Sequence, residues 1–393
     1  MASDVESPDL RLAQDRAAAA LDALRARHLR RLGHIVPGTR IGVPAWPPVG
    51  RFGSKQRITG SWNYWWQAHL VDVLVDAAVH RGDLRAARDA VRLIRGIRIR
   101  NVGRWTNDYY DDMAWLALAT ERVDRLLSGA VWTRHRRGLR ILTSTLYDAW
   151  APEHGGGIPW RTTDHFFNVP ANGPAAIFLA RRDRAERAIA MADWIHDELL
   201  LPSGLLADGF WPEPGGGRRE VNNTYTYCQG VGLGAYLEAY RADRDGRHVE
   251  RIDALLTAVA ERMCTDGVIN AAGGGDGGLF AGILARYLAL VATDLPADAP
   301  DAGRIRSKAA EIVLTSADSA WNTRAEVDGL PLFGPDWRTA ATVPTADAPG
   351  ARFVGGAVAS SATPERDLSV QLSGALLLEA AVAVTTRSSE HTG

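Results

Sequence analysis

Two kinds of helical segment alternate along the chain, and they differ in how their apolar positions are distributed. In one kind, apolar side chains follow one face and Arg, Asp and Glu fill the rest: residues 10–31, 84–95, 132–150, 184–200, 247–263 and 302–317. In the other kind, apolar or small residues lie on nearly all sides: residues 62–79, 111–120, 170–180, 225–239, 278–291 and 368–384. A helix that is apolar all round is buried, whereas an amphipathic helix covers a core.

The strict alternation of these segments predicts an all-α fold, the (α/α)6 barrel, in which six inner helices are wrapped by six outer helices. Each pair would bury its apolar face only against neighbouring pairs, so residues 1–393 are expected to form a single domain. An open helical-repeat solenoid is the alternative. The absence of a fixed repeat length and of a shared repeat consensus counts against it.

The connections between segments are unequal, and the long ones precede the inner helices. Stretches rich in Gly and Pro cover residues 32–60, 151–164, 202–220 and 267–277. Residues 322–365 form the longest irregular stretch, an insertion within the barrel with room for a short hairpin. Long loops gathered at one end of a barrel build a binding face. A functional site is therefore expected where the inner helices begin.

Composition narrows the classes of partner. The 393 residues carry a formal net charge of −1, so neither nucleic acid nor an anionic membrane surface is indicated. No run of about 18 apolar residues predicts a membrane span. The N-terminus lacks a basic stretch followed by an apolar one, so a cytoplasmic location is expected, and we expect a monomer. Cys228 and Cys264 lack metal-ligand spacing and are expected to be free thiols.

Two adjacent carboxylates, Asp111 and Asp112, open one of the apolar segments. The run from Asn107 to Trp115 reads Asn-Asp-Tyr-Tyr-Asp-Asp-Met-Ala-Trp. Successive residues on a helix point about 100° apart, so both carboxylates can reach one substrate. Glycoside hydrolysis needs two carboxyl groups; a separation of about 5 Å is typical of retention, and a wider one leaves room for water and inversion. An ordinary surface pair at a helix N-terminus is the alternative, which the flanking aromatic residues disfavour.

The roles of the two carboxylates stay open at this point. Mutual repulsion should keep one of them protonated as a general acid, while the helix N-terminus favours the other as an anion. The residues themselves do not decide which is which. Asp108 lies three residues before Asp111, and it either faces the same way or caps the helix.

Further polar and aromatic residues are expected to line a sugar-binding cleft at the same end. Thirteen tryptophans is a high number for this length, and several stand beside amides or charges. The candidate substrate-binding residues are Trp65, Trp66, Asn107, Asp108, Tyr110, Trp115, Trp160, Arg161, Asn168, Asn172, Tyr227, Gln229 and Asp276. Helix capping is the alternative for Asn168 and Asp276, and a buried structural network is the alternative for Tyr227 and Gln229. No His, Asp and Glu set has zinc-site spacing, so no metal is expected.

Together these segments resemble glycoside hydrolase family 76, the α-1,6-mannanases. The most specific match is the run Tyr109-Tyr110-Asp111-Asp112-Met113-Ala114-Trp115. Supporting matches are residues 65–69, 157–160, 168–173, 225–230, 276–282 and 368–374. The resemblance implies an (α/α)6 barrel and a retaining, endo-acting hydrolase of α-1,6-linked mannosides, with Asp111 as the nucleophile and Asp112 as the acid/base. It implies a carbohydrate substrate and neither a metal nor an organic cofactor.

Three positions depart from the family pattern, which would alter the sugar contacts. Cys228 stands where the family often has Asn, and Phe167 and Ala281 stand where it often has Lys. Two rival functions keep the same barrel: a sugar epimerase or unsaturated uronyl hydrolase, and a glycan-binding barrel without turnover. Epimerases of this shape rely on histidine, and the histidines here do not gather at the expected site. The intact pair of Asp111 and Asp112 disfavours the binding protein.

Overall fold

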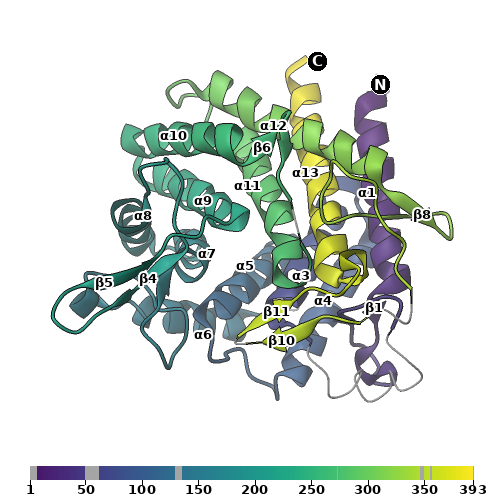
Figure 1. The fold of residues 1–393 in the computed structure, drawn as a ribbon, viewed down its shortest axis with the longest axis horizontal. Helices are drawn as coiled ribbons and strands as arrows, with labels where there is room; N and C mark the ends of the chain where they lie inside the picture. The colour runs from purple at the N-terminus through teal and green to yellow at the C-terminus, as the bar shows by residue number, and fades with distance from the viewer. Residues whose placement is uncertain are drawn as a thin grey trace.

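The computed structural model describes residues 7–48, 62–128, 135–271, 273–345, 349–354 and 356–392. These residues form twelve α-helices in two rings (Figure 1). The inner helices are α3 (Tyr64–Arg81), α5 (Tyr110–Leu126), α7 (Val169–Ala180), α9 (Thr226–Asp243), α11 (Phe280–Asp294) and α13 (Leu368–Thr392). The outer helices are α1 (Pro8–Arg27), α4 (Leu84–Arg100), α6 (Arg136–Asp148), α8 (Ala185–Leu199), α10 (Gly246–Arg262) and α12 (Ala302–Thr323). Each predicted helix is present; residues 132–134 of the predicted segment 132–150 lie outside the described residues.

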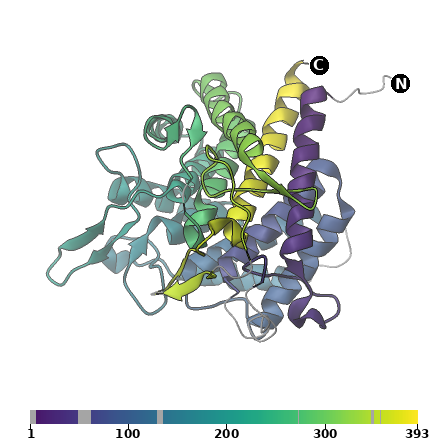
Figure 2. The same ribbon diagram turned by 45° about the vertical axis from the view of Figure 1, so that its right-hand side comes forward.

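The six inner helices close into a ring. Helix α3 packs on α5, α5 on α7, α7 on α9, α9 on α11 and α11 on α13, and α13 returns to α3. Helices α4, α6, α8, α10 and α12 each pack on the inner helix that precedes them in the chain. Helix α1 lies beside α13, so the first outer helix covers the last inner one (Figure 2). This closure confirms the predicted (α/α)6 barrel and excludes the open solenoid.

Small and apolar residues let the inner helices approach closely. In α7 every residue from Val169 to Leu179 is buried. A Cβ atom at Gly230 of α9 would come within 3.0 Å of the Leu284 Cα on α11. A Cβ atom at Gly282 would come within 2.5 Å of the Ser373 Cα on α13. A larger residue at Gly282 would therefore push two inner helices apart.

Two inner-helix segments, Gly275–Asp294 and Leu368–Ser389, are long and apolar enough to cross a membrane by length and composition. In the barrel, 67% and 89% of their most apolar stretches are buried inside the protein. Their composition is therefore that of core helices, which are surrounded by other helices rather than by solvent.

The strands are short and lie outside the helical rings. They are β1 (Leu29–Arg30), β2 (Ile41–Gly42), β3 (Phe167–Asn168), β4 (Gly209–Pro212), β5 (Arg218–Val221), β6 (Cys264–Thr265), β7 (Val268–Ile269), β8 (Ala325–Val327), β9 (Leu330–Leu332), β10 (Arg352–Val354) and β11 (Ala357–Ala359). Short 3-10 helices are η1 (Leu32–His34), η2 (Pro152–His154), η3 (Gly275–Leu279) and η4 (Pro364–Arg366). The predicted insertion at residues 322–365 begins inside α12 and holds two hairpins, β8–β9 and β10–β11.

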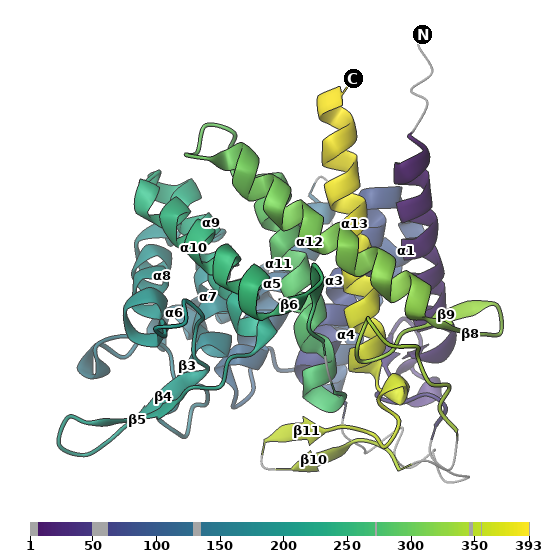
Figure 3. The ribbon, with the colours of Figure 1, turned by 45° about the horizontal axis from the view of Figure 1, so that its top comes forward.

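One end of the barrel, which we call the mouth, is where the inner helices begin. The antiparallel sheet β3–β4–β5 and the hairpin β10–β11 both lie at the mouth, on different sides of it (Figure 3). The described parts of the long loops that precede inner helices therefore lie at one end, as the sequence predicted.

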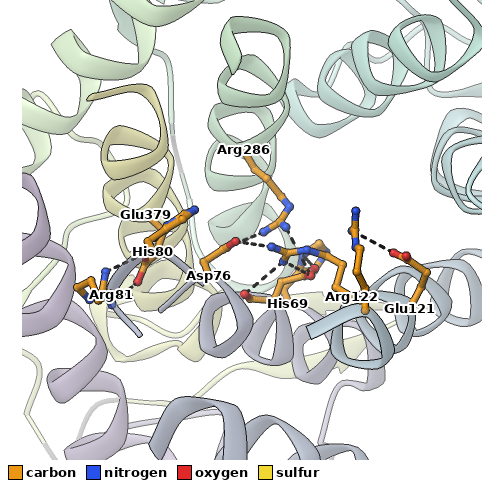
Figure 4. Close-up of polar contacts among 10 residues, drawn as sticks. His69, Asp76, His80, Arg81, Glu121, Arg122, Arg286 and Glu379 are labelled. Carbon is orange, nitrogen blue, oxygen red and sulfur yellow. Dashed lines mark hydrogen bonds and ion pairs between the residues drawn. The ribbon is translucent and has the colours of Figure 1, made fainter. Parts of the chain in front are cut away.

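The opposite end of the barrel, the rear end, holds a network of buried ion pairs (Figure 4). Arg122 of α5 donates to Asp72 at 2.7 Å and to Asp76 at 2.5 Å, and Arg286 of α11 donates to Asp76 at 2.8 Å. Both acids belong to α3, so the network joins three inner helices. A cavity of about 490 Å³ lies beside it, lined by residues near the C-terminal ends of the inner helices.

Candidate active site

Asp111 and Asp112 lie in the first turn of α5, at the mouth of the barrel. This turn is attached to the loop that precedes α7. The Tyr110 N–H donates to the Trp160 carbonyl at 2.9 Å, and Tyr109 forms an isolated antiparallel bridge with the residue after Trp160. The attachment brings the Trp160 side chain next to the two acids. Both residues are partly exposed at the mouth.

The hydrogen bonds around the two carboxyl groups differ. Asp111 accepts two: from the Trp160 indole Nε1–H at 2.9 Å and from the Asp112 backbone N–H at 2.8 Å. Asp112 accepts one, from the Asn107 amide nitrogen at 2.6 Å. The Asn107 amide oxygen in turn accepts from the Tyr109 N–H at 3.0 Å, which fixes the orientation of that amide. Because hydrogen bonds to a carboxylate favour its ionised form, Asp111 is the better supported anion.

Burial raises the pKa of both acids, but to different extents. It raises the pKa of Asp111 to about 7, against the hydrogen bonds from Asp112 and Trp160 and with a contribution from the charge of Asp276. Burial and then the charge of Asp111 raise the pKa of Asp112 well above its ordinary value. The favoured state of the pair has the proton on Asp112 and the negative charge on Asp111. A carboxylic acid beside a carboxylate is the pair that glycoside hydrolysis requires.

A third acid near the pair, Asp208, was not identified from the sequence. It directly precedes β4, where its N–H donates to the Asn223 carbonyl at 2.8 Å and its carbonyl accepts from the Val169 N–H at 2.9 Å. Burial, together with the charge of Asp111, raises the pKa of Asp208 to about 7. The Cys228 sulfur lies 4.0 Å from its carboxyl group. Only its place in a Gly-rich loop before an aromatic strand could have signalled a role.

Asp276 is a fourth acid at the mouth, and it lies in η3 before α11. Its Oδ1 accepts the indole N–H groups of Trp65 at 3.1 Å and Trp66 at 3.0 Å, and its Oδ2 accepts the Val358 N–H at 2.6 Å. The helix-capping alternative for Asp276 does not hold, because Gly274 occupies the cap position of η3, and contact of Asp276 with a substrate stays a prediction. Burial raises the pKa of Asp276 to about 6, although these three hydrogen bonds lower it.

Aromatic side chains form two groups beside the acids. In the first group, Tyr227 of α9 stacks on Phe280 of α11 with ring centroids 4.0 Å apart, and Trp65 of α3 lies 6.3 Å from the same ring. All three are partly exposed. They come from three inner helices, so this group forms one wall of the mouth. Phe280 was not predicted as a site residue, although it lies in a segment that resembles the family.

The second aromatic group surrounds Phe166. Trp211 of β4 stacks on this ring at 5.1 Å, and Trp160 lies edge-on to it at 6.2 Å. The Arg161 guanidinium lies 4.6 Å above the Trp160 ring and pairs with Asp164 at 2.6 Å. Trp160, Arg161 and Trp211 are partly exposed. Flat rings and a guanidinium fork near the acids suit a ligand with both C–H faces and hydroxyl groups.

Three predicted amide contacts with sugar hydroxyls are wrong, because these amides bond to the protein itself. Asn172 is fully buried and bonds to both the N–H and the carbonyl of Ile158. Gln229 is fully buried and bonds in the same way to Leu206. Asn168 is buried and caps α7, so the capping alternative holds.

Two predicted ring contacts are also wrong. Trp66 is 0% exposed and Trp115 is 3% exposed, so neither ring offers a face to a sugar. Trp66 reaches the site only through its indole N–H, and Trp115 packs against the His69 ring at 4.6 Å. Asp108 is exposed and does not cap α5, so its contact with substrate stays a prediction. Asn107, Tyr110, Trp65, Trp160, Arg161, Tyr227 and Asp276 are partly exposed.

The three departures from the family pattern all lie inside the protein. Phe167, Cys228 and Ala281 are buried. Phe167 packs against Trp194 and Phe210. These positions therefore act on the site by packing beneath it, and none of them presents a surface to a ligand.

A closed helical barrel with an acid and a carboxylate side by side among partly exposed rings defines the class of helical-barrel glycosidases. The profile of glycosyl hydrolase family 76 matches residues 48–345, and the chain belongs to this family. The resemblance seen in the sequence is thereby confirmed.

Solved structures of similar fold include mannanases. The α-1,6-mannanase GH76A from Salegentibacter sp. HEL1_6 is 27% identical with a TM-score of 0.77, and the match covers 95% of this chain and 99% of that one. An inactive variant of that mannanase, with two consecutive aspartates changed to asparagine, forms a complex with α-1,6-mannotriose. The Lin0763 protein from Listeria innocua, 24% identical with a TM-score of 0.77 over 95% of this chain and 98% of that one, shares the fold. No match was found among curated proteins.

Proposed function

We propose that this protein hydrolyses α-1,6-linked mannosides with retention of the anomeric configuration. Asp111 attacks the anomeric carbon while Asp112 gives its proton to the leaving glycosidic oxygen, which forms a glycosyl-enzyme. Asp112, now ionised, takes a proton from water as the water oxygen attacks the same carbon. The sugar leaves, Asp111 regains its charge and Asp112 its proton.

The observation that carries this proposal is the unequal environment of the two acids. Asp111 accepts hydrogen bonds from an indole and a backbone amide, whereas Asp112 has one amide donor and the more strongly raised pKa. The first environment supports a nucleophile that is ionised before the substrate binds, and the second supports a general acid. The hydrogen bonds and the burial of the two acids therefore support the same roles that the family resemblance implies.

The relatives support the substrate class. The Salegentibacter mannanase is an α-1,6-mannanase, and its inactive variants at two consecutive aspartates bind α-1,6-mannotriose and α-1,6-mannotetrose. Asp111 and Asp112 are consecutive aspartates at the mouth of the same kind of barrel. Membership of the family supports a glycoside hydrolase, and the α-1,6-mannoside linkage is the finer part of the proposal.

Digestion of linear and branched α-mannans, followed in time by proton NMR, tests the proposal. We expect cleavage of α-1,6 linkages in which the α-anomer of the new reducing end appears first and the β-anomer forms later by mutarotation. Initial formation of the β-anomer would show inversion and remove the nucleophile role of Asp111. Change at the reducing end without cleavage would favour an epimerase, and binding without any product would favour a non-catalytic barrel.

The pH dependence of kcat/KM should reflect the pKa values of the two acids. Asp111 must be ionised, so we expect the rate to fall about tenfold for each pH unit below about 7, the raised pKa of Asp111. Asp112 must be protonated, so the rate should fall again only above its still higher pKa, which places the optimum on the alkaline side of the Asp111 pKa. The measurement is kcat/KM for an α-1,6-manno-oligosaccharide across the pH range in which the protein stays folded. Full activity near pH 4, where both acids would be protonated, contradicts this assignment.

A further inference from the structure

The hairpin β10–β11 lies across part of the mouth (Figures 1 and 3). We call residues 349–354 and 356–361 the strap. The base of the strap is closed by the Ala362 N–H, which donates to the Pro349 carbonyl at 3.0 Å. The strap precedes η4 and α13 in the chain, so it is rooted at the α13 side of the ring.

One side of the strap is fixed to η3, which leads into α11. The Val358 N–H donates to Asp276, and a Cβ atom at Gly275 would lie only 2.0 Å from the Val358 carbonyl oxygen. The buried carboxyl group of Asp367 accepts the Gly275 N–H at 2.8 Å and the Ser361 N–H at 3.1 Å. These contacts hold the strap against an acid that interacts with the catalytic pair.

The other side of the strap reaches the residues beside Asp111. A Cβ atom at Gly356 would lie 3.0 Å from the Trp160 ring and 3.7 Å from the Tyr109 hydroxyl. The Trp160 indole donates to Asp111, so the strap touches a direct neighbour of the proposed nucleophile. Helices α5 and α11 are opposite each other in the ring of six. The strap therefore bridges the mouth on the side of α3 and α13.

We propose that the strap ends the sugar-binding cleft on the α3–α13 side of the Asp pair, so that a glycan is bound near one of its ends. This inference rests on the proposed function and concerns the same site. A chain that enters over α7 and α9 can pass Asp111 by only a short stretch before it meets the strap. The enzyme then releases short products of one fixed length from one end of a long glycan. The family resemblance alone implied cleavage within chains.

The strap also carries an aromatic side chain that can contact the sugar unit bound nearest to the strap. Phe353 is directly opposite Val358 in the hairpin, and opposed residues of an antiparallel pair project from the same face. Val358 is buried, whereas Phe353 is 61% exposed. Phe353 is thus placed to stack on the sugar that lies farthest toward the strap.

The lengths of the earliest products test this proposal. Wild type acting on a long linear α-1,6-mannan should release one short product while the remaining chains shorten gradually. Val358→Pro removes the N–H that donates to Asp276, and the released strap should give a mixture of many product lengths. Val354→Ala, at an exposed position on the opposite face of the hairpin, is the matched control and should keep the wild-type pattern. Many product lengths from wild type at the earliest times, or an unchanged pattern from folded Val358→Pro, would overturn the proposal.

Binding provides a second readout that does not need turnover. In the Asp111→Asn background, calorimetry with α-1,6-manno-oligosaccharides of increasing length should show an affinity that stops rising at a short length. Adding Phe353→Ala should weaken binding about fivefold to tenfold for oligosaccharides that reach the strap and leave shorter ones unchanged. An affinity that keeps rising with length, or no effect of Phe353→Ala at any length, refutes the strap proposal. Absence of hydrolysis by wild type with this length-limited binding intact refutes the proposed function alone.

Discussion

Asp111→Asn and Asp112→Asn are each expected to lower kcat by at least about 10³-fold, the size typical of losing a nucleophile or a general acid/base. Asparagine keeps the size of the side chain and an oxygen that can accept the bonds from Trp160 and Asn107. The fold should therefore persist, which circular dichroism and thermal unfolding can check. Asp124→Asn, farther along the same helix, is the matched control and should keep the wild-type rate.

Substrates with different leaving groups separate the two roles. An aryl α-mannoside with a good leaving group does not need a general acid, so Asp112→Ala should still form the glycosyl-enzyme from it. Azide should then attack that intermediate and give the α-mannosyl azide. In Asp111→Ala, azide can only replace the nucleophile and should give the β-azide. Wild-type rates in either variant, or the same azide anomer from both, would contradict the assignment.

Asp76→Asn is expected to lower the free energy of unfolding by about 3–5 kcal/mol, because it leaves a buried positive charge without its partner. Asp76 is buried and accepts from both Arg122 and Arg286, which come from two other inner helices. Removing its charge leaves the two guanidinium groups with Asp72 alone. Chemical denaturation at neutral pH measures the loss.

An exposed ion pair provides the control for this substitution. Arg304 pairs with Asp253 at 2.7 Å on the outer surface, so Asp253→Asn should cost less than about 1 kcal/mol. Burial opposes ionisation of Asp76, but Arg122 and Arg286 outweigh it and hold the pKa of Asp76 well below its ordinary value. The stabilisation is therefore complete above the unfolded-state pKa of about 4 and is lost as the pH falls below it. Equal losses from the two substitutions, or a loss from Asp76→Asn that does not shrink at low pH, would contradict this account.

The ring of helices could be predicted because the pattern of apolar and polar residues along a helix shows which of its faces are buried. The segment that became α7 is apolar or small on all sides, and the structure buries it from Val169 to Leu179. The outer helices carry charges on one face, as the segment 84–95 does. Neither pattern depends on knowing which helix lies next to which, so local composition was enough to place six helices inside six others.

The functions of the polar residues depended on neighbours that the sequence does not reveal. An Asn or Gln within an aromatic stretch gives the same sequence pattern whether its amide contacts a sugar or the protein backbone. Asn172 and Gln229 bond to Ile158 and Leu206, which belong to the preceding loops, and this pairing exists only in the folded chain. The catalytic pair was easier to locate, because two adjacent carboxylates must repel each other wherever they lie.

The loops at the mouth were the least predictable part. Asp208 and the strap lie in irregular segments without hydrophobic periodicity, so the sequence predicted loops at this end of the barrel but not which of their residues approach the acids. Asp208 is placed by bonds to Asn223 and Val169, and the strap by bonds to Asp276 and Asp367. Asn223, Val169 and Asp276 lie far along the chain from the residues that they bond to, whereas Asp367 follows Ser361 by six residues.

The attachment site of a trapped sugar tests the central claim most directly. A 2-fluoro mannosyl substrate with a good leaving group slows the second step, and peptide mass spectrometry then locates the covalent sugar. We expect a single mannosyl ester on Asp111. A sugar on Asp112 or Asp208, or turnover to the β-anomer without any covalent sugar, would show that the nucleophile has been wrongly assigned.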